Sequence, residues 1–305
     1  MNLNIEQIRQ VLPTKRWFGE KGRNISAIHL IDLGILHEEA DSVLALGLVD
    51  VGFEEGPDSI YHLPLLIEGD SVRDATEEPE RLRILGEMLA HGHPIKGEHG
   101  IFHFSGPGLD PGNPPGSGSV RTIDGEQSNT SVVFDDSVIL KFFRKVEPGT
   151  NPDLELTRVL TNEGFRSIPE QLGEIFYEAT ADAEVVPEEA HSPNIDLGIA
   201  QRFIHGGREG WTIALDHIGA LFDQVHEADV PEDRNALVEE RAADILGAIE
   251  QLGDATATMH VTLAREDIEP ELRPEPVIED DLRHWSASAR ALLAATAQRS
   301  EELSR

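Results

Sequence analysis

The fold is decided by residues 119–144, SVRTIDGEQSNTSVVFDDSVILKFFR, whose pattern predicts three short strands joined by two turns. Val120–Ile123 is a short β-prone run, and Thr130–Phe134 is β-branched and aromatic, as strands tend to be. Turn residues fill the break between these two runs, and Asp135-Asp136-Ser137 has the chemistry of a hairpin turn. Val138–Phe143 is the third strand. We therefore expect an antiparallel β unit in the middle of the chain.

One charge interrupts the third strand of this unit. Lys141 lies inside an otherwise apolar run, and a buried ammonium is costly unless it has a partner. A phosphate or a carboxylate would serve. The polar loop one hairpin earlier could hold the phosphates of a nucleotide against Lys141. The sequence thus predicts the front half of a nucleotide site of the kinase type.

Composition limits the class of protein. The chain has 305 residues, enough for two domains, and its 39% hydrophobic and 27% charged residues are ordinary for a water-soluble globular protein. No apolar run approaches the length of a membrane span, and the N-terminus lacks a signal-peptide pattern, so we expect a cytoplasmic protein without a membrane partner. The absence of cysteine excludes disulfides and thiolate metal sites.

The net charge of -32 disfavours some partners. Such a surface repels nucleic acid and anionic lipid at long range, so we expect neither as a partner. It also opposes the binding of ATP unless positive charge is concentrated locally and Mg²⁺ is present. We hypothesise adaptation to high salt, where screening removes most self-repulsion. The alternative is an acidic protein of an ordinary habitat.

The pattern of strands, helices and breaks predicts an α+β fold in several parts. A helix at 4–12, strands at 25–33, 42–51, 59–67 and 100–104, and a helix at 77–91 compose a predicted N-terminal cap domain. Residues 105–118 are nearly all Gly, Pro, Ser and Asn, which indicates a linker or a loop across the surface. The remaining parts are a kinase-like N-lobe over 119–204 and a partial helical C-lobe over 205–305.

The most basic stretch of the cap has two interpretations. Arg16–Arg23, RWFGEKGR, combines three cationic residues with two adjacent aromatics. It is either a turn that faces an anion or a sugar, or an aromatic anchor flanked by solvated arginines.

A helix predicted at Pro152–Asn162 lies downstream of the lysine strand. Asn151 is a good N-cap, Pro152 suits the first helical position, and Asp153 complements the helix dipole. Glu155, in its first turns, either pairs with Lys141 or is a surface charge. Gln201–Ile204 ends a predicted strand before a glycine turn and a helix, which suits a hinge whose backbone meets an adenine edge, or an ordinary loop.

With these residues identified, the chain resembles the maltokinases, which share the fold of aminoglycoside phosphotransferases and eukaryotic-like kinases. Leu12-Pro13 with Arg16–Arg23 is similar to the opening of that family's N-terminal cap. Residues 124–131, 138–144 and 147–155 are similar to its phosphate loop, lysine strand and first helix. Residues 252–264, with Leu252-Gly253 and Met259-His260, are similar to a helix of its C-terminal lobe.

The resemblance implies transfer of the γ-phosphoryl group of ATP to the anomeric hydroxyl of maltose. The product, maltose 1-phosphate, would feed α-glucan (glycogen) synthesis, with trehalose synthase as a possible partner and Mg²⁺ as the metal. By position, Lys141 would hold phosphates and Glu155 would orient it. The residues implied to cover the nucleotide are Gln127, Ser128, Asn129, Thr130 and Ser131. Those implied to line the adenine site are Gln201, Arg202, Phe203 and Ile204.

The chain departs from the family's pattern at the catalytic loop. The family continues to a His-Gly-Asp loop and a metal-binding Asp-Phe segment, and neither occurs here, so no catalytic residue and no metal ligand is assigned. We expect a truncated maltokinase. The alternatives are a related amino-sugar kinase, and a non-catalytic module that binds a nucleotide or a protein partner.

Overall fold

The computed structural model describes residues 3–123, 128–180, 194–227, 231–265, 267–268, 272–273 and 275–303. The chain divides into two compact units, Met1–Gly253 and Asp254–Arg305, and the division falls within helix α5. The first unit contains both β-sheets and all of the candidate site. The second contains the end of α5 (Pro231–Leu263) and the helix α6 (Glu279–Leu303).

The first unit begins with an antiparallel sheet of five strands, in the order β1-β2-β3-β10, with β4 also paired to β3. Its strands are β1 (Ile25–Glu38), β2 (Val43–Phe53), β3 (Ser59–Glu68), β4 (Ser71–Asp74) and β10 (Lys145–Val146). The helices of this region are α1 (Ile5–Val11), η1 (Leu12–Thr14), η2 (Ala75–Glu77), η3 (Pro79–Arg83) and α2 (Ile84–His91). The predicted helix at 77–91 is therefore a 3-10 segment followed by a shorter α-helix.

A second antiparallel sheet has seven strands in the order β5-β6-β11-β12-β9-β8-β7. They are β5 (Ile95–Lys96), β6 (Gly100–Ser105), β7 (Val120–Ile123), β8 (Asn129–Phe134), β9 (Val138–Phe143), β11 (Gln171–Ala179) and β12 (Asn194–Arg202). The helices that follow are α3 (Pro152–Asn162) and α4 (Gly210–Glu227). The mixture of helices and antiparallel sheets confirms the α+β class.

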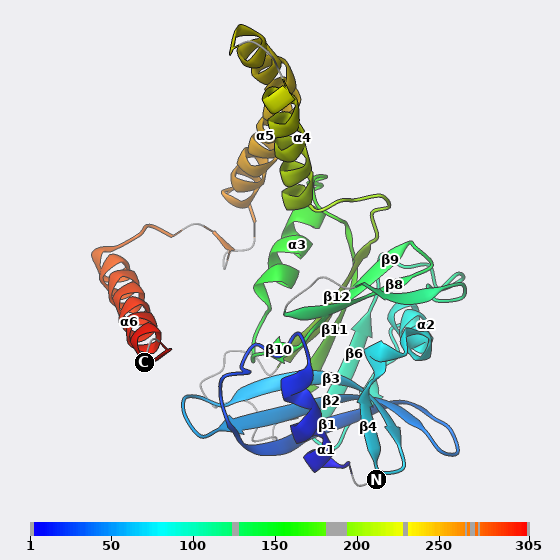
Figure 1. Ribbon diagram of the computed structural model, residues 1–305. Helices are drawn as coiled ribbons and strands as arrows, with labels where there is room; N and C mark the ends of the chain where they lie inside the picture. The colour runs from blue at the N-terminus through cyan, green and yellow to red at the C-terminus, as the bar shows by residue number, and fades with distance from the viewer. Residues whose placement is uncertain are drawn as a thin grey trace. The chain divides into compact units, whose positions relative to one another are not determined.

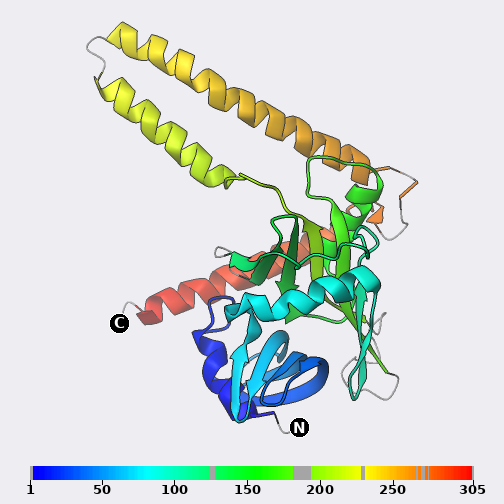
Figure 2. The same ribbon diagram turned by 90° about the vertical axis from the view of Figure 1, so that its right-hand side faces the viewer.

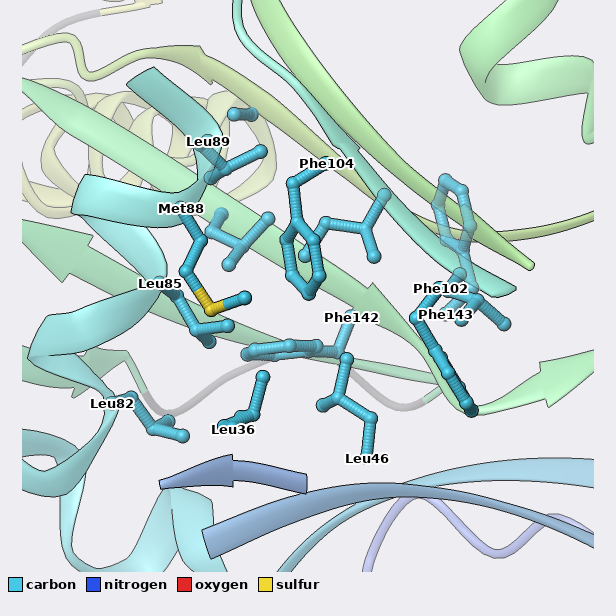
Figure 3. Packing of buried hydrophobic residues seen from close by; sticks show 14 of the residues in the cluster. Leu36, Leu46, Leu82, Leu85, Met88, Leu89, Phe102, Phe104, Phe142 and Phe143 are labelled. Atoms are coloured by element: carbon cyan, nitrogen blue, oxygen red, sulfur yellow. The ribbon is translucent and has the colours of Figure 1, made fainter. Parts of the chain in front are cut away.

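Two hydrophobic cores cover the two faces of the five-stranded sheet. One face packs against α1 and the aromatic pair Trp17 and Phe18. The other shares a core with α2 and the seven-stranded sheet, in which Leu46, Leu85 and Phe142 are all buried. Figure 2 shows η3 and α2 between the two sheets, and Figure 3 shows the side chains of this shared core. Because β9 continues into β10, one segment of chain takes part in both sheets.

The basic turn of the cap is an aromatic anchor. The exposed fractions of Trp17 and Phe18 are 9% and 1%, and both rings pack near Tyr61, with centroids 6.1 and 5.2 Å away. Arg23 is bound to Glu20 at 2.6 Å, and its guanidinium lies 3.7 Å from the centre of the Phe53 ring. The structure therefore confirms the aromatic anchor of the second interpretation, but Arg23 is bound to its neighbours and not solvated as that interpretation expected.

The glycine- and proline-rich segment 105–118 lies packed on the protein. Pro115 is buried, and a Cβ at Gly86 of α2 would lie 1.7 Å from the Pro115 carbonyl oxygen. Asp135 accepts hydrogen bonds from the Gly116 and Gly118 amides, both at 2.7 Å. Of the two alternatives for residues 105–118, a linker or a loop across the surface, these contacts favour the loop.

The limits predicted for the domains stay predictions. One pairing bears on them: β6, which we assigned to the cap, is hydrogen-bonded to β11 of the seven-stranded sheet along its whole length. Within the described part of the chain, no helix has both the length and the apolar character that a bilayer span requires.

Candidate nucleotide site

Helix α3 is fixed to the seven-stranded sheet at its first residues. The Asn151 side chain caps the helix by accepting from the Asp153 amide at 2.9 Å, as the sequence predicts, and Pro152 takes the first position. The Asn151 amide donates to Asp196 Oδ2 of β12 at 2.7 Å. In the second turn, Arg158 Nη2 lies 2.8 Å from Glu174 Oε2 of β11. These bonds place α3 on one face of β11 and β12 (Figure 1). The opposite face of these strands packs against the shared core. We call the face that carries α3 the outer face.

The strand register gathers three predicted site residues on this outer face. Lys141 of β9 is paired with Ser131 of β8 on one side and with Ile199 of β12 on the other. Directly opposed residues of an antiparallel pair share a face. Ile199 in turn pairs with Glu174, which α3 contacts, and Gln201 lies two residues further along β12. Ser131, Lys141 and Gln201 are therefore on the side of the sheet that carries α3.

Lys141 is half-buried and, among the described residues, makes no ion pair and no side-chain hydrogen bond. Glu155 is also half-buried, in the first turns of α3, and the described residues include no ion pair between the two. The Lys141–Glu155 pair thus stays a prediction. A half-buried ammonium without a protein partner favours the binding of an anionic ligand, to which it can donate hydrogen bonds, because the cost of its desolvation is still uncompensated.

Acidic side chains surround the start of α3. Burial raises the pKa of the Asp196 carboxyl, and the charges of Glu174 and Glu155 raise it further, against the opposing hydrogen bond from the Asn151 amide and the charge of Arg158. Asp196 reaches the outer face because a register shift between Ile175 and Phe176 places it opposite Phe176. No regular alternation along β12 predicts this position.

The predicted hinge leaves the sheet at the end of β12. Gln201 is buried, whereas Arg202 is exposed and pairs with Glu170 at 2.6 Å. The Phe203 amide donates to the Ser137 carbonyl at 2.8 Å, and the ring of Phe203 lies 5.3 Å from the Arg121 guanidinium. Ile204 is 57% exposed. The predicted hinge is therefore hydrogen-bonded to the turn between β8 and β9, the turn that precedes the strand of Lys141.

The remaining predicted residues lie around the start of β8. Gln127 is outside the described residues, Ser128 is exposed, and Asn129 begins the strand. The side chain of Thr130 accepts a hydrogen bond from Arg144 Nε at 2.9 Å, on the cap side of the sheet. The side chains of Thr130 and Ser131 therefore lie on opposite faces of the sheet.

Two residues that the structure makes prominent were given no role by the sequence interpretation. Arg144 is fully buried and bonded to Asp74, and Asp196 is the half-buried acid that accepts from the Asn151 amide at the start of α3. A charged residue directly after the apolar run Val138–Phe143 was a signal for Arg144. Asp196 had no sequence signal. The described residues contain no group of three or more His, Asp or Glu side chains that could hold a metal ion.

Known proteins match this chain in two ways. Residues 12–93 match the family described as the maltokinase N-terminal cap domain. The fold matches a glucosamine kinase in two crystal forms. Form A has a TM-score of 0.53 at 17% sequence identity, over 94% of this chain and 57% of the other. Form B has a TM-score of 0.55 at 18% identity, over 97% of this chain and 58% of the other.

These matches set the limits of the comparison. The chain spans less than three fifths of the length of the glucosamine kinase chains, so the similarity shows the fold of the shared part. The cap match begins at η1 and contains the aromatic anchor, β1 to β4 and α2. Residues 12–93 are therefore similar to the N-terminal cap of maltokinases, and the fold of the chain is similar to that of the shared part of a glucosamine kinase.

Proposed function

We propose that the outer face at Lys141 binds the phosphates of ATP, and that the chain is part of a maltokinase-type phosphotransferase. The observation that carries the proposal is the half-buried Lys141, which has no partner among the described residues and lies beside Ser131, in a sheet that follows a maltokinase-type cap. In this arrangement Lys141 would neutralise phosphate charge. The strand register would keep Ser131, which is buried, beside Lys141, and the hinge at Gln201–Ile204 would present backbone groups to the adenine.

The proposed reaction forms maltose 1-phosphate. The anomeric hydroxyl oxygen of maltose would attack the γ-phosphorus, the bond between that phosphorus and the β,γ-bridging oxygen would break, and the hydroxyl proton would leave to a base. Lys141 would contribute by positioning the phosphates and by balancing charge, which are the main contributions of protein groups to phosphoryl transfer. The described residues offer no cluster of ligands for Mg²⁺, so the proposal assigns them the nucleotide alone.

The first test is nucleotide binding by the Lys141→Ala variant. A hydrogen bond to a charged group contributes about 1.5–3 kcal/mol, so we expect the affinity for ATP, measured by calorimetry, to fall about tenfold to a hundredfold. The matched control is Lys145→Ala, because Lys145 is exposed, pairs with Glu20 at 3.3 Å and lies four residues further on. Equal affinities for Lys141→Ala and the parent would remove Lys141 from the site.

A second measurement separates the candidate functions. Transfer of ³²P from ATP should be assayed with maltose and with glucosamine as acceptors. Labelled maltose phosphate would support the maltokinase proposal, and labelled glucosamine would instead support the amino-sugar kinase. Binding of ATP without transfer to either sugar would leave a nucleotide-binding module. The proposals of glycogen synthesis as the pathway and of trehalose synthase as a partner rest on the first outcome.

A further inference from the structure

Arg144 joins the cap to the strands of the candidate site. It lies between β9 and β10, its side chain is 0% exposed, and its guanidinium is 4.6 Å from the centre of the Trp17 ring. Its Nη2 donates to both oxygens of Asp74, at 3.1 and 2.8 Å, and to Thr76 Oγ1 at 3.0 Å. Asp74 ends β4 and Thr76 lies in η2, and both belong to the residues that match the maltokinase cap. The Nη2 atom and the face of the Arg144 guanidinium are therefore in contact with cap residues.

The other side of Arg144 holds the hairpin of the candidate site. Its Nε donates to Thr130 Oγ1 of β8 at 2.9 Å, and the next residue along that strand, Ser131, is opposite Lys141. The partner strand β7 has its own bond to the cap, because Thr122 Oγ1 donates to the Thr76 carbonyl at 2.7 Å. Strand β7 is thus bonded directly to the cap segment 74–76, and β8 is linked to the same segment through Arg144.

A pocket adjoins this network on the side of the hairpin. Its volume is about 460 Å³, and four of the residues around Arg144 line it: Trp17, Asp74, Thr76 and Thr130. A densely packed core would hold the hairpin by shape alone. The ladder with β9 and the buried side chains of Val132 and Phe134 hold β8 at its other end, and the bonds of Arg144 and Thr122 add directional contacts on the side of the cavity.

Net stability does not account for a buried pair of this kind. Replacing a buried ion pair by apolar residues of similar volume is often neutral or stabilising, whereas removal of one partner is costly. One nitrogen of Arg144, Nη1, has no hydrogen-bond partner among the described residues. The pair instead fixes the position of β8 relative to the cap segment, since a guanidinium forms several bonds in one plane.

We propose that Arg144 is a positioning residue of the nucleotide site, through which the cap sets the place of β8 and hence of Ser131 opposite Lys141. This rests on the proposed function for the identity of the ligand. Arg144 acts through Thr130 and touches no part of the nucleotide. The cap then contributes to ATP affinity from a region that carries none of the predicted nucleotide contacts.

Two variants of the full chain test this role without leaving a buried charge unpaired. Asp74→Asn with Arg144→Met removes the pair and retains the side-chain oxygen that caps Thr76. Arg144→Lys keeps a cation for Asp74, but one ammonium cannot also reach Thr130 in the geometry of a guanidinium. Ser137→Ala is the control, because it removes a hydroxyl bond to Phe134 at the opposite end of β8.

The measurements are ATP affinity by calorimetry and hydrogen exchange of the β7 and β8 amides without nucleotide. Networks of this kind change coupling by about threefold to thirtyfold, so we expect both Arg144 variants to bind ATP more weakly by that factor. Exchange should rise in residues 120–123 and 129–132, with exchange in β2 and β3 unchanged. Ser137→Ala should match the parent in both measurements.

The outcomes separate this proposal from the proposed function. Unchanged exchange in both variants would overturn the positioning role, and so would unchanged ATP affinity in variants whose hairpin exchanges faster. A parent chain that binds no ATP would refute the nucleotide site. In that case faster exchange in the variants would still establish that Arg144 positions the hairpin, and unchanged exchange would refute both.

Discussion

At the scale of single residues, the interface between the two sheets contains a histidine that burial keeps neutral. His62 of β3 is fully buried, donates from Nδ1 to the Leu197 carbonyl at 3.2 Å, and packs on the Phe142 ring. Burial and the charge of Arg144 lower the pKa of the His62 imidazole to about 3. An ordinary histidine titrates near pH 6.5, so this residue binds a proton far more readily in the unfolded chain.

His62 should therefore make the protein less stable as the pH falls below 6.5. Between pH 6.5 and 3 the unfolded state binds more protons than the folded state, so stability rises with pH, by at most about 1.4 kcal/mol per pH unit for one group. Replacement by asparagine, His62→Asn, should flatten this part of the curve in urea unfolding from pH 4 to 7.

The control for that series is His37→Asn, since His37 has a 55% exposed side chain on β1. It should keep the parent's slope. A His62→Asn slope equal to the parent's would show that His62 is not the group that titrates.

At the scale of elements, helix α2 and the segment 105–118 are held together by a close approach. Gly86 of α2 lies against the Pro115 carbonyl, and Arg83 donates to the carbonyls of Gly116 and Gly118. The same segment reaches the turn after β8 through Asp135. Composition indicates a linker or a loop across the surface, and the structure shows a largely exposed loop that these bonds and contacts hold at Pro115 and Gly116.

Gly86→Ala should destabilise the protein by about 1–3 kcal/mol, the usual cost of overpacking, because its Cβ would overlap the backbone of Pro115. The matched control is Gly219→Ala in α4, where nothing lies within 4 Å of the new Cβ. Alanine is the better helix former, so Gly219→Ala should be neutral or slightly stabilising. Urea midpoints check both, and a Gly86→Ala midpoint at or above the parent's would exclude the close approach.

The elements themselves were largely predictable. The helix at Pro152–Asn162 has the limits that the sequence predicts, because Asn151, Pro152 and Asp153 act within one turn. The three strands from Val120 to Phe143 also match their predicted ranges within a residue. The helix predicted at 77–91 was only partly right, since its first half is 3-10 and follows Pro79. Element ends depend on backbone bonds that propensity does not specify.

At the scale of the whole molecule, charge is the dominant feature. A net charge of -32 disfavours compact states through self-repulsion. The Debye length falls from about 10 Å at 0.1 M salt to about 3 Å at 1 M, so screening should relieve most of this repulsion.

The melting temperature should therefore rise between 0.05 M and 2 M KCl. Calorimetry at a fixed pH checks this, with sucrose at equal osmolality as the control for solvent exclusion. A melting temperature that stays constant or falls with KCl would contradict the hypothesis of adaptation to high salt. A rise with sucrose equal to that with KCl would also contradict it.

The candidate site divides between what the sequence determined and what the tertiary structure decided. The sequence alone placed Lys141 in a strand and Glu155 in the first turns of a helix, because strand alternation and helix capping depend on neighbours a few residues away. Only the tertiary structure placed Asp74 against Arg144, seventy residues away in sequence, and turned Asp196 to the outer face through a register shift. Such contacts arise from the packing of two sheets, and no local pattern encodes which distant charge a buried guanidinium will meet.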